Sequence, residues 1–394
     1  MRFYPSHLQT AVHLLQQYSC NEPFAAFLKK YFSAHRQLGS RDRRTITSYC
    51  YAAFRLGPAG KALPPEDRIC AGLLLTASQP QPLLEALRPQ FNAAVGLPVA
   101  EKLKLLGWEG RPLHDFFPGA HQLSAGVEAE AFVHSHWQQP HLYLRIRPGH
   151  ASMVHAQLQR AGIPYETLSA TIVALPNGTD VSRILQTDRH VVVQDWSSQQ
   201  TGRLLQTAVQ LLQPTNAVVL WDCCAASGGK SLLAADLLQQ VQLHVSDVRE
   251  SILHNLRRRF ETAGITRYRL FVADLTRPPQ GNPSLPQGVD LLWADVPCTG
   301  SGTWGRTPEQ LLCHRPGDEQ RYVTLQRSIL NNVVSALRNG GILLYTTCSA
   351  YRCENEEQTQ WLQQQHGLQL LEQQVLPGYR HRADTMFAAL LCKY

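Results

Sequence analysis

Two cysteines that lie fifty positions apart are the side chains of this sequence best placed to carry out chemistry together. Cys298 comes shortly after the apolar run 289–294, and Cys348 comes shortly after the apolar run 341–345. We interpret both runs as buried strands that open into loops, where α/β enzymes place their reactive groups. Two thiols at neighbouring strand ends could share one active site. Few reactions need such a pair without a metal or a disulfide, and one that does is methylation of carbon 5 of a pyrimidine.

The pyrimidine reaction explains why a thiol is needed. Carbon 5 of cytosine is a poor nucleophile until a thiolate adds to carbon 6 and converts the ring to an enamine. After methyl transfer, the proton on carbon 5 must be removed and the thiolate expelled. The residues alone do not rank Cys298 and Cys348 for these two tasks.

The composition narrows the class of protein. The chain has 394 residues, of which 44% are hydrophobic and 17% charged, so we expect a large core and two or three domains. No apolar stretch is long enough to span a bilayer, and the first residues lack the apolar core of a secretory signal, so we expect a cytoplasmic protein. The ten cysteines contain no C-x-x-C pair. We expect all ten to be reduced thiols and expect no metal site, with His134 and His136 at the surface.

The net charge of +7 is concentrated near the start of the chain. Residues 1–60 carry eight basic side chains against Glu22 and Asp42, and therefore hold six of the seven net charges. Four of the basic residues cluster at Arg36, Arg41, Arg43 and Arg44. This pattern fits RNA binding and fits a solvated helix face equally well. For the later basic run 257–259 we favour the solvated face.

Three regions differ in their apolar periodicity. Residues 1–125 have helical spacing, which predicts an all-helical domain. Residues 126–190 predict a small α+β module of the split βαβ type, with strands at 142–146 and 171–175 and helices at 151–161 and 181–185. Strands and helices alternate over 191–394, which predicts the α/β class with a doubly wound, Rossmann-like parallel sheet. The Pro/Gly-rich segment 278–287 should be a surface loop.

A loop rich in small residues follows the first strand of the third region, predicted at 218–222. Small residues before a helix let a nucleotide-type cofactor approach the backbone closely. The Walker pattern is incomplete because Cys224 replaces its first glycine, and the G-x-G-x-x-G spacing of dinucleotide sites is absent. S-adenosylmethionine remains. The candidate residues for binding it are Cys224, Ala225, Ala226, Ser227, Gly228, Gly229, Lys230, Asp247, Asp274 and Asp295.

These residues and their order resemble the RNA cytosine-5 methyltransferases of the Nol1/Nop2/Sun family, and the whole layout is similar to the bacterial ribosomal, RsmB-type branch. The resemblance covers 191–394 best, while the helical first region is similar to the NusB-like RNA-binding domain of that branch and the middle region to an RRM-like module. Matching motifs lie at 194–199, 222–230, Asp247, Asp274, 295–298, 347–349 and 354–356. One position departs from the family, because Ser227 stands where it usually has proline.

The resemblance implies a class I S-adenosylmethionine-dependent methyltransferase that forms 5-methylcytosine in RNA, with 16S ribosomal RNA as the expected partner. It assigns Cys348 as the nucleophile and Cys298 as the group that assists release. Asp295 would hydrogen-bond N3 of the cytosine, and Lys230 would lower a thiol pKa. We expect a monomer that contacts neither membrane nor metal.

Three alternatives stay open. One is a noncatalytic RNA-binding assembly factor of the same fold, which would have no need of either thiol. Another is a cytosine-5 methyltransferase that acts on transfer RNA or 23S ribosomal RNA. The third is a methyltransferase that acts on a protein or a small molecule, which would not require two cysteines or a basic N-terminal domain.

Overall fold

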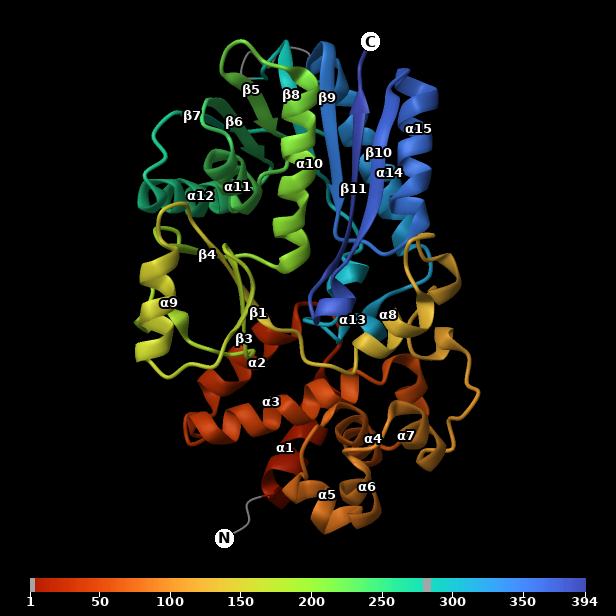
Figure 1. The fold of residues 1–394 in the computed structure, drawn as a ribbon. Coiled ribbons are helices and arrows are strands. Elements are labelled where there is room, and N and C mark those ends of the chain that lie inside the picture. The colour runs from red at the N-terminus through yellow and green to blue at the C-terminus, as the bar shows by residue number, and fades with distance from the viewer. Residues whose placement is uncertain (1–3, 279–284) are drawn as a thin grey trace. The chain divides into compact units, whose positions relative to one another are not determined.

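The computed structural model describes residues 4–278 and 285–394. Most of the segment predicted as a surface loop at 278–287 lies outside the described residues. The chain forms two compact units, each described by itself (Figure 1). Unit 1 contains the described residues up to Leu123 together with Glu128–Gln139 and Trp304–Pro316, and unit 2 contains Ser124–Val127, Pro140–Thr303 and Gly317–Tyr394. The domain borders expected near residues 125 and 190 remain predictions.

Unit 1 is helical throughout its described residues. Its α-helices are α1 (Tyr4–Gln17), α2 (Phe24–Ala34), α3 (Ser40–Phe54), α4 (Pro65–Thr76), α5 (Pro82–Leu87), α6 (Pro89–Ala94), α7 (Val99–Leu105), α8 (Ala129–Ser135) and α13 (Gln310–Cys313). Apolar side chains at helical spacing build its core, with Phe24 and Phe54 packed edge to face at 4.8 Å between ring centroids. Segment 304–316 joins this core although it follows a strand of unit 2 in the sequence.

The basic side chains of unit 1 divide into exposed and buried ones. Arg36, Arg41 and Arg44 are exposed. Arg55 is only 4% exposed, and its guanidinium donates to backbone carbonyls, including that of Gly305 at 2.7 Å, so it stabilises the unit. The surface position expected for His136 is wrong, because it is buried with Nδ1 2.9 Å from the Phe132 carbonyl oxygen, and burial lowers its pKa to about 4.

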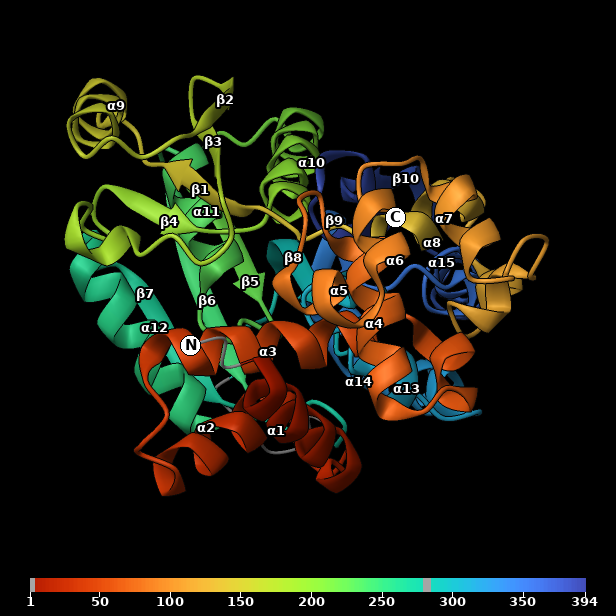
Figure 2. The same cartoon turned by 90° about the horizontal axis from the view of Figure 1, so that it is seen from below.

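Unit 2 begins with a small four-stranded antiparallel sheet. Its elements are β1 (Leu142–Ile146), α9 (Ala151–Arg160), β2 (Glu166–Ser169), β3 (Ile172–Leu175) and β4 (Val191–Val193). The strand order β2-β3-β1-β4 is that of a split βαβ module. Helix α9 lies along this sheet (Figure 2), and its Val154 and Leu158 pack against apolar residues of β1 and β3.

The larger sheet of unit 2 has seven strands in the order β10-β11-β9-β8-β5-β6-β7. The strands are β5 (Val218–Asp222), β6 (Val241–Asp247), β7 (Tyr268–Val272), β8 (Val289–Asp295), β9 (Leu337–Thr347), β10 (Gln369–Pro377) and β11 (Thr385–Cys392). The strands β7, β6, β5, β8 and β9 pair in parallel, while β11 runs antiparallel to β9 and β10. The order turns back between β5 and β8, so the predicted Rossmann-like α/β fold class is confirmed.

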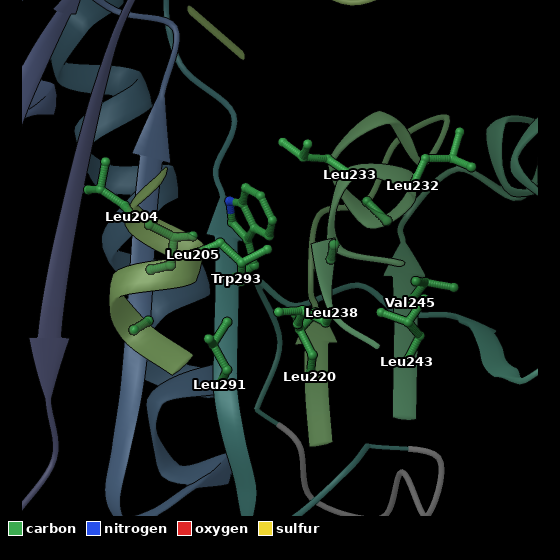
Figure 3. Packing of buried hydrophobic residues seen from close by; sticks show 14 of the residues in the cluster. Leu204, Leu205, Leu220, Leu232, Leu233, Leu238, Leu243, Val245, Leu291 and Trp293 are labelled. Atoms are coloured by element: carbon green, nitrogen blue, oxygen red, sulfur yellow. The ribbon is translucent and has the colours of Figure 1, made fainter. Parts of the chain in front are cut away.

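Helices cover both faces of the larger sheet. They are α10 (Trp196–Leu212), α11 (Gly229–Leu237) and α12 (Glu250–Ala263) on one face, and α14 (Asp318–Val333) and α15 (Glu356–His366) on the other. Figure 3 shows Leu204 and Leu205 of α10 beside Leu291 and Trp293 of β8. A core on each face holds the strands rigidly, so the loops at their carboxyl ends have fixed positions. Among the described residues, no helix combines the length and the hydropathy needed to cross a bilayer.

A disulfide joins Cys20 and Cys313 within unit 1. The expectation that all ten cysteines are reduced is therefore wrong for these two. Their Cα atoms lie 5.5 Å apart although 293 positions separate them in sequence. Fold packing creates this proximity, which no local spacing pattern indicates.

The disulfide predicts how many thiols react. Alkylation of the denatured protein purified without reductant should label the eight free cysteines, and prior reduction should raise the number to ten. Mass spectrometry of the labelled peptides would identify them. A Cys392→Ser variant is the control, since it should lose one label under both conditions, whereas Cys20→Ser should gain one at Cys313 before reduction. Ten labels without reduction would contradict the bond.

Candidate active site

The structure brings the two cysteine loops together. Cys298 follows the end of β8 and Cys348 directly follows the end of β9, and these two strands are parallel neighbours. Their Sγ atoms are 3.2 Å apart, within hydrogen-bond distance, and both residues are partly exposed. One small molecule or base could therefore contact both thiols.

A buried carboxylate holds the two loops. Glu354, which is fully buried, accepts hydrogen bonds from the Thr299 amide at 2.9 Å and from the Ser349 hydroxyl at 2.6 Å. Thr299 follows Cys298 and Ser349 follows Cys348, so one side chain ties both loops. Gln326 of α14 donates a further bond to the same carboxylate at 2.9 Å. Burial raises the pKa of Glu354, which these donors oppose.

The adjacent Asn355 extends this clamp. Its Nδ2 donates to the Ser349 carbonyl at 3.0 Å, and its Oδ1 accepts from the Thr347 hydroxyl at 2.6 Å. Both backbone neighbours of Cys348 are thus held by one amide side chain. Residues 354–356 are among the motifs that resemble the family. Nothing in the sequence indicates that this segment joins the two cysteine loops.

An ion pair lies beside the thiols. Nζ of Lys230, in the first turn of α11, is 2.7 Å from Oδ2 of Asp295, the last residue of β8. The Thr346 hydroxyl donates to the other carboxylate oxygen at 2.9 Å, so Asp295 is fixed at both atoms. Burial is the largest single effect and works to lower the pKa of Lys230, but the charge and hydrogen bond of Asp295, together with the nearby Cys348 and Asp222, raise it overall. Lys230 is therefore an ammonium ion in the native protein.

The contact between the two thiols affects the protonation of Cys298. The hydrogen bond to Cys348, together with burial, raises the pKa of Cys298 well above its usual range. Cys298 therefore stays a thiol, which can donate its S–H to the Cys348 sulfur. The Lys230 ammonium lies close enough to Cys348 to interact with it electrostatically.

A cavity of about 480 Å³ lies at the carboxyl ends of β5, β6, β7 and β8. Its lining includes five of the predicted cofactor residues, Cys224, Ala226, Asp247, Asp274 and Asp295. The other five do not line it. Ala225, Ser227, Gly228, Gly229 and Lys230 form the turn behind it and the start of α11.

The cavity suits an adenosyl group in shape and chemistry. Asp247 accepts hydrogen bonds from the amides of Ala226 at 3.0 Å and Arg249 at 2.9 Å, which holds its carboxylate against the loop. Asp247 supplies acceptors for ribose hydroxyls and Asp274 an acceptor for the adenine end, while apolar side chains such as Leu275 and Ile329 offer a surface for the purine ring. The residues present therefore fit S-adenosylmethionine.

The turn behind the cavity requires glycine at one position. Gly228 has φ +82°, and a Cβ there would come within 2.8 Å of Leu256 on α12. Close packing of the loop on α12 is therefore possible only with glycine.

Ser227, the departure from the family pattern, has a partner that a proline side chain could not bind. Nη1 of Arg259 donates to the Ser227 carbonyl at 2.9 Å and to its hydroxyl at 3.0 Å. Arg259 also pairs with Asp188 of the small module at 2.8 Å. The expected solvated face at 257–259 is therefore wrong for Arg259, because α12 turns this side chain onto the cofactor loop.

Asp222 lies beneath the same loop and is fully buried. Its Oδ2 accepts from the Ser231 hydroxyl at 2.5 Å, while Oδ1 has no hydrogen-bond partner among the described residues. Burial raises its pKa to about 7. No pattern in the sequence indicates a raised pKa at this position, since strand-end aspartates are usually ionised.

A doubly wound sheet with acidic side chains at successive strand ends around a cavity for a nucleoside defines a class I methyltransferase-type domain. The family described as 16S rRNA methyltransferase RsmB/F matches residues 209–391. The ribosomal RNA small subunit methyltransferase B of Xanthomonas campestris is 32% identical over 359 residues, which cover 81% of this chain and 78% of that protein. The chain belongs to this family, as its motifs predict. S-adenosylmethionine is the cofactor of these methyltransferases.

Two further comparisons bear on length and fold. A probable ribosomal RNA small subunit methyltransferase B of Synechocystis is 29% identical over 243 residues. The match covers 61% of this chain but only 53%, about half, of that relative. The crystal structure of PH0851 has a TM-score of 0.71 and 20% identity, with all of both chains covered. That likeness supports the fold.

The Arg259 contacts predict an effect on cofactor affinity. Arg259→Leu removes two bonds that hold the Ser227 turn, so the dissociation constant for S-adenosylmethionine should rise about tenfold, the loss expected from one charge-assisted interaction. Ser227→Ala should cause a smaller rise, since it removes only the hydroxyl. Isothermal titration calorimetry measures both. Arg257→Leu, an exposed arginine of the same helix, is the control, and equal affinities in Arg257→Leu and Arg259→Leu would refute the role.

The buried acid predicts a pH dependence of stability. The pKa of Asp222 rises from 3.8 in the unfolded chain to about 7 in the native protein. The native state therefore holds this proton more tightly, and the resulting stabilisation is full below pH ~4 and is lost as the pH rises through ~7. Asp222→Asn should flatten this fall in unfolding free energy, measured by urea titration across that range. Asp274→Asn, at a more exposed acid, is the control. Parallel profiles for wild type and Asp222→Asn would exclude the effect.

Proposed function

We propose that this protein uses S-adenosylmethionine to form 5-methylcytosine in 16S ribosomal RNA. The observation that carries the proposal is the pair of sulfur atoms 3.2 Å apart beside the Lys230–Asp295 ion pair. A base whose carbons 5 and 6 reach this point meets a nucleophilic sulfur and a second thiol at once. Membership in the 16S rRNA methyltransferase family favours RNA as the substrate.

The first step assigned to the protein is addition of the Cys348 sulfur to carbon 6 of the cytosine. The new C–S bond uses the thiolate electron pair, and electrons of the 5,6 double bond move into the ring. Asp295 stabilises the ring charge through a proton shared with N3. Lys230 keeps Asp295 in place and favours the thiolate over the thiol.

Bound S-adenosylmethionine supplies an electrophilic methyl group, and the cavity lined by Asp247, Asp274 and Asp295 would hold it. Carbon 5 of the adduct is the nucleophile. Cys298, 3.2 Å from the sulfur that forms the adduct, then assists transfer of the carbon 5 proton to water. The electron pair of that C–H bond re-forms the 5,6 double bond, and the C–S bond breaks with its electron pair returning to Cys348. Both sulfurs end the cycle unmodified.

The exposed basic side chains Arg36, Arg41 and Arg44 of unit 1 are proposed contacts for the RNA backbone. Guanidinium groups on a solvent-exposed surface attract phosphates without reading sequence. They would therefore increase affinity, while the thiol site determines which base reacts.

The proposal predicts opposite outcomes for the two cysteines. Cys348→Ala should abolish methylation, because no thiolate can add to carbon 6. Cys298→Ala should accumulate a covalent RNA adduct that survives denaturing gel electrophoresis, because addition proceeds and release fails. Bisulfite sequencing of total RNA from cells that lack the gene and carry each variant would locate the modified cytosine. Cys353→Ala, a nearby cysteine outside the thiol pair, is the control and should retain methylation.

Three results would change the proposal. Unchanged methylation in Cys348→Ala would overturn the assignment of the nucleophile. A gene-dependent cytosine in transfer RNA or 23S ribosomal RNA would correct the substrate. Absence of any gene-dependent cytosine would favour the noncatalytic assembly factor.

A further inference from the structure

A second cavity of unit 2, separate from the cofactor cavity, has a volume of about 710 Å³. This lies within the range of about 300–1,000 Å³ that binding pockets for small ligands occupy. Its wall is formed by α10, by the second half of α11, and by residues of β1, β2 and β3 in the small module. It shares no lining residue with the cofactor cavity. The proposed reaction therefore does not use this second cavity.

Two largely buried guanidinium groups share one acid beside this second cavity. Arg145 and Asp236 both line it, and Arg147 pairs with the same carboxylate, so two guanidinium groups share one acid. The side chains of Arg145 and Asp236 are 6% and 5% exposed. Nη2 of Arg145 has no hydrogen-bond partner among the described residues. A buried cation with an unused donor favours an anionic ligand nearby.

An aromatic pair lines the cavity. Trp196, the first residue of α10, and His381 both belong to its wall, and their ring centroids are 4.3 Å apart. Trp196 is half-buried and His381 is exposed. Flat rings in a cavity wall offer a surface on which a nucleobase can stack.

Polar side chains complete the wall. Gln200 and Arg203 of α10 face the cavity from one side, and Thr167 and Ser169 of β2 face it from the other, with one acid, Glu166, beside them. Arg203 is exposed. These groups supply donors and acceptors for a base edge or a sugar, and a second cation for a phosphate.

A chain of contacts runs from the residue after Trp196 to the thiol loops. The hydroxyl of Ser197, next to Trp196, donates to the Asp384 carbonyl. Asp384 precedes Thr385, whose carbonyl packs so closely on Gly302 that a Cβ there would lie 1.9 Å from it. The Gly302 amide in turn donates to the Cys348 carbonyl at 2.9 Å. Trp196 is thus only a few contacts away from the proposed nucleophile.

We propose that this cavity binds a nucleotide of the RNA strand that neighbours the target cytosine. Its base would stack on Trp196 and His381, and its phosphate would bind the positive charge of Arg145 and Arg203. The ligand class follows from the combination of an aromatic surface, a buried guanidinium with an unpaired nitrogen together with the exposed Arg203, and a chain of contacts to the thiol loops. The inference rests on the proposed function for the choice of RNA as substrate.

The first test measures RNA affinity by fluorescence anisotropy, with a labelled single-stranded RNA that contains one central cytosine. Trp196→Ala should raise the dissociation constant about 5- to 100-fold, the range of one base–aromatic stack, and Arg203→Ala should raise it and weaken its salt dependence. Trp361→Ala and Arg267→Ala, which alter the same residue types outside this cavity, are the controls. Cofactor affinity and circular dichroism should match wild type in all four variants, which excludes misfolding.

The second test locates the contact in the unmodified protein. The same RNA, with 4-thiouridine on either side of the cytosine, is irradiated and the linked peptide identified by mass spectrometry. A cross-link to the α10 segment that begins at Trp196 supports the proposal. Cross-links elsewhere, or equal RNA affinities in Trp196→Ala and Trp361→Ala, overturn it.

The two proposals fail in different ways. RNA methylation by wild-type protein, with normal affinity in Trp196→Ala, would remove the cavity proposal and leave the methyltransferase proposal intact. Loss of RNA affinity in Trp196→Ala, without methylation by wild type, would keep the cavity as an RNA site and refute the reaction.

Discussion

The geometry of the candidate active site depends on one carboxylate that solvent does not reach. Glu354 holds the loop after β8 and the loop after β9 through Thr299 and Ser349, and the sulfur atoms meet only if both loops are held. Burying a carboxylate is unfavourable unless donors surround it. Two of the donors, Thr299 and Ser349, belong to the loops that carry the thiols. The hydrogen bonds that stabilise the buried Glu354 carboxylate therefore also fix the distance between the thiols.

The rest of unit 2 supports this arrangement from both faces of the sheet. Parallel pairing of β8 with β9 places Asp295 beside Thr346, while the helices packed on each face prevent the strand ends from shifting. Lys230 reaches Asp295 from the start of α11 because the small-residue loop turns tightly after β5. The thiols, the ion pair and the cofactor cavity therefore share one rigid edge, which suits a reaction that requires several atoms in line.

Apolar runs and motif order were enough to predict the fold class, the strands at 218–222 and 289–294, and the cofactor. Other features depend on packing between distant segments. β2 has mostly polar, exposed residues and lacks the apolar signal of a strand. Nothing in the run 257–259 distinguishes Arg259, which meets Ser227 only after α12 has packed. The bond between Cys20 and Cys313 likewise follows from segment 304–316 folding into the helical core.

Arg259 contacts both Asp188 and Ser227, and so bridges two parts of unit 2 for which we propose different ligands. Asp188 belongs to the small module that helps to enclose the second cavity, and Ser227 belongs to the turn behind the cofactor cavity. A ligand in the second cavity that alters the distance between Asp188 and Ser227 must alter the free energy of the Ser227 turn. By thermodynamic reciprocity, a cofactor bound at that turn must then change the affinity of the second cavity for its ligand by the same factor. The contacts of Arg259 with Ser227 and Asp188 thereby make the affinities for the two ligands depend on each other.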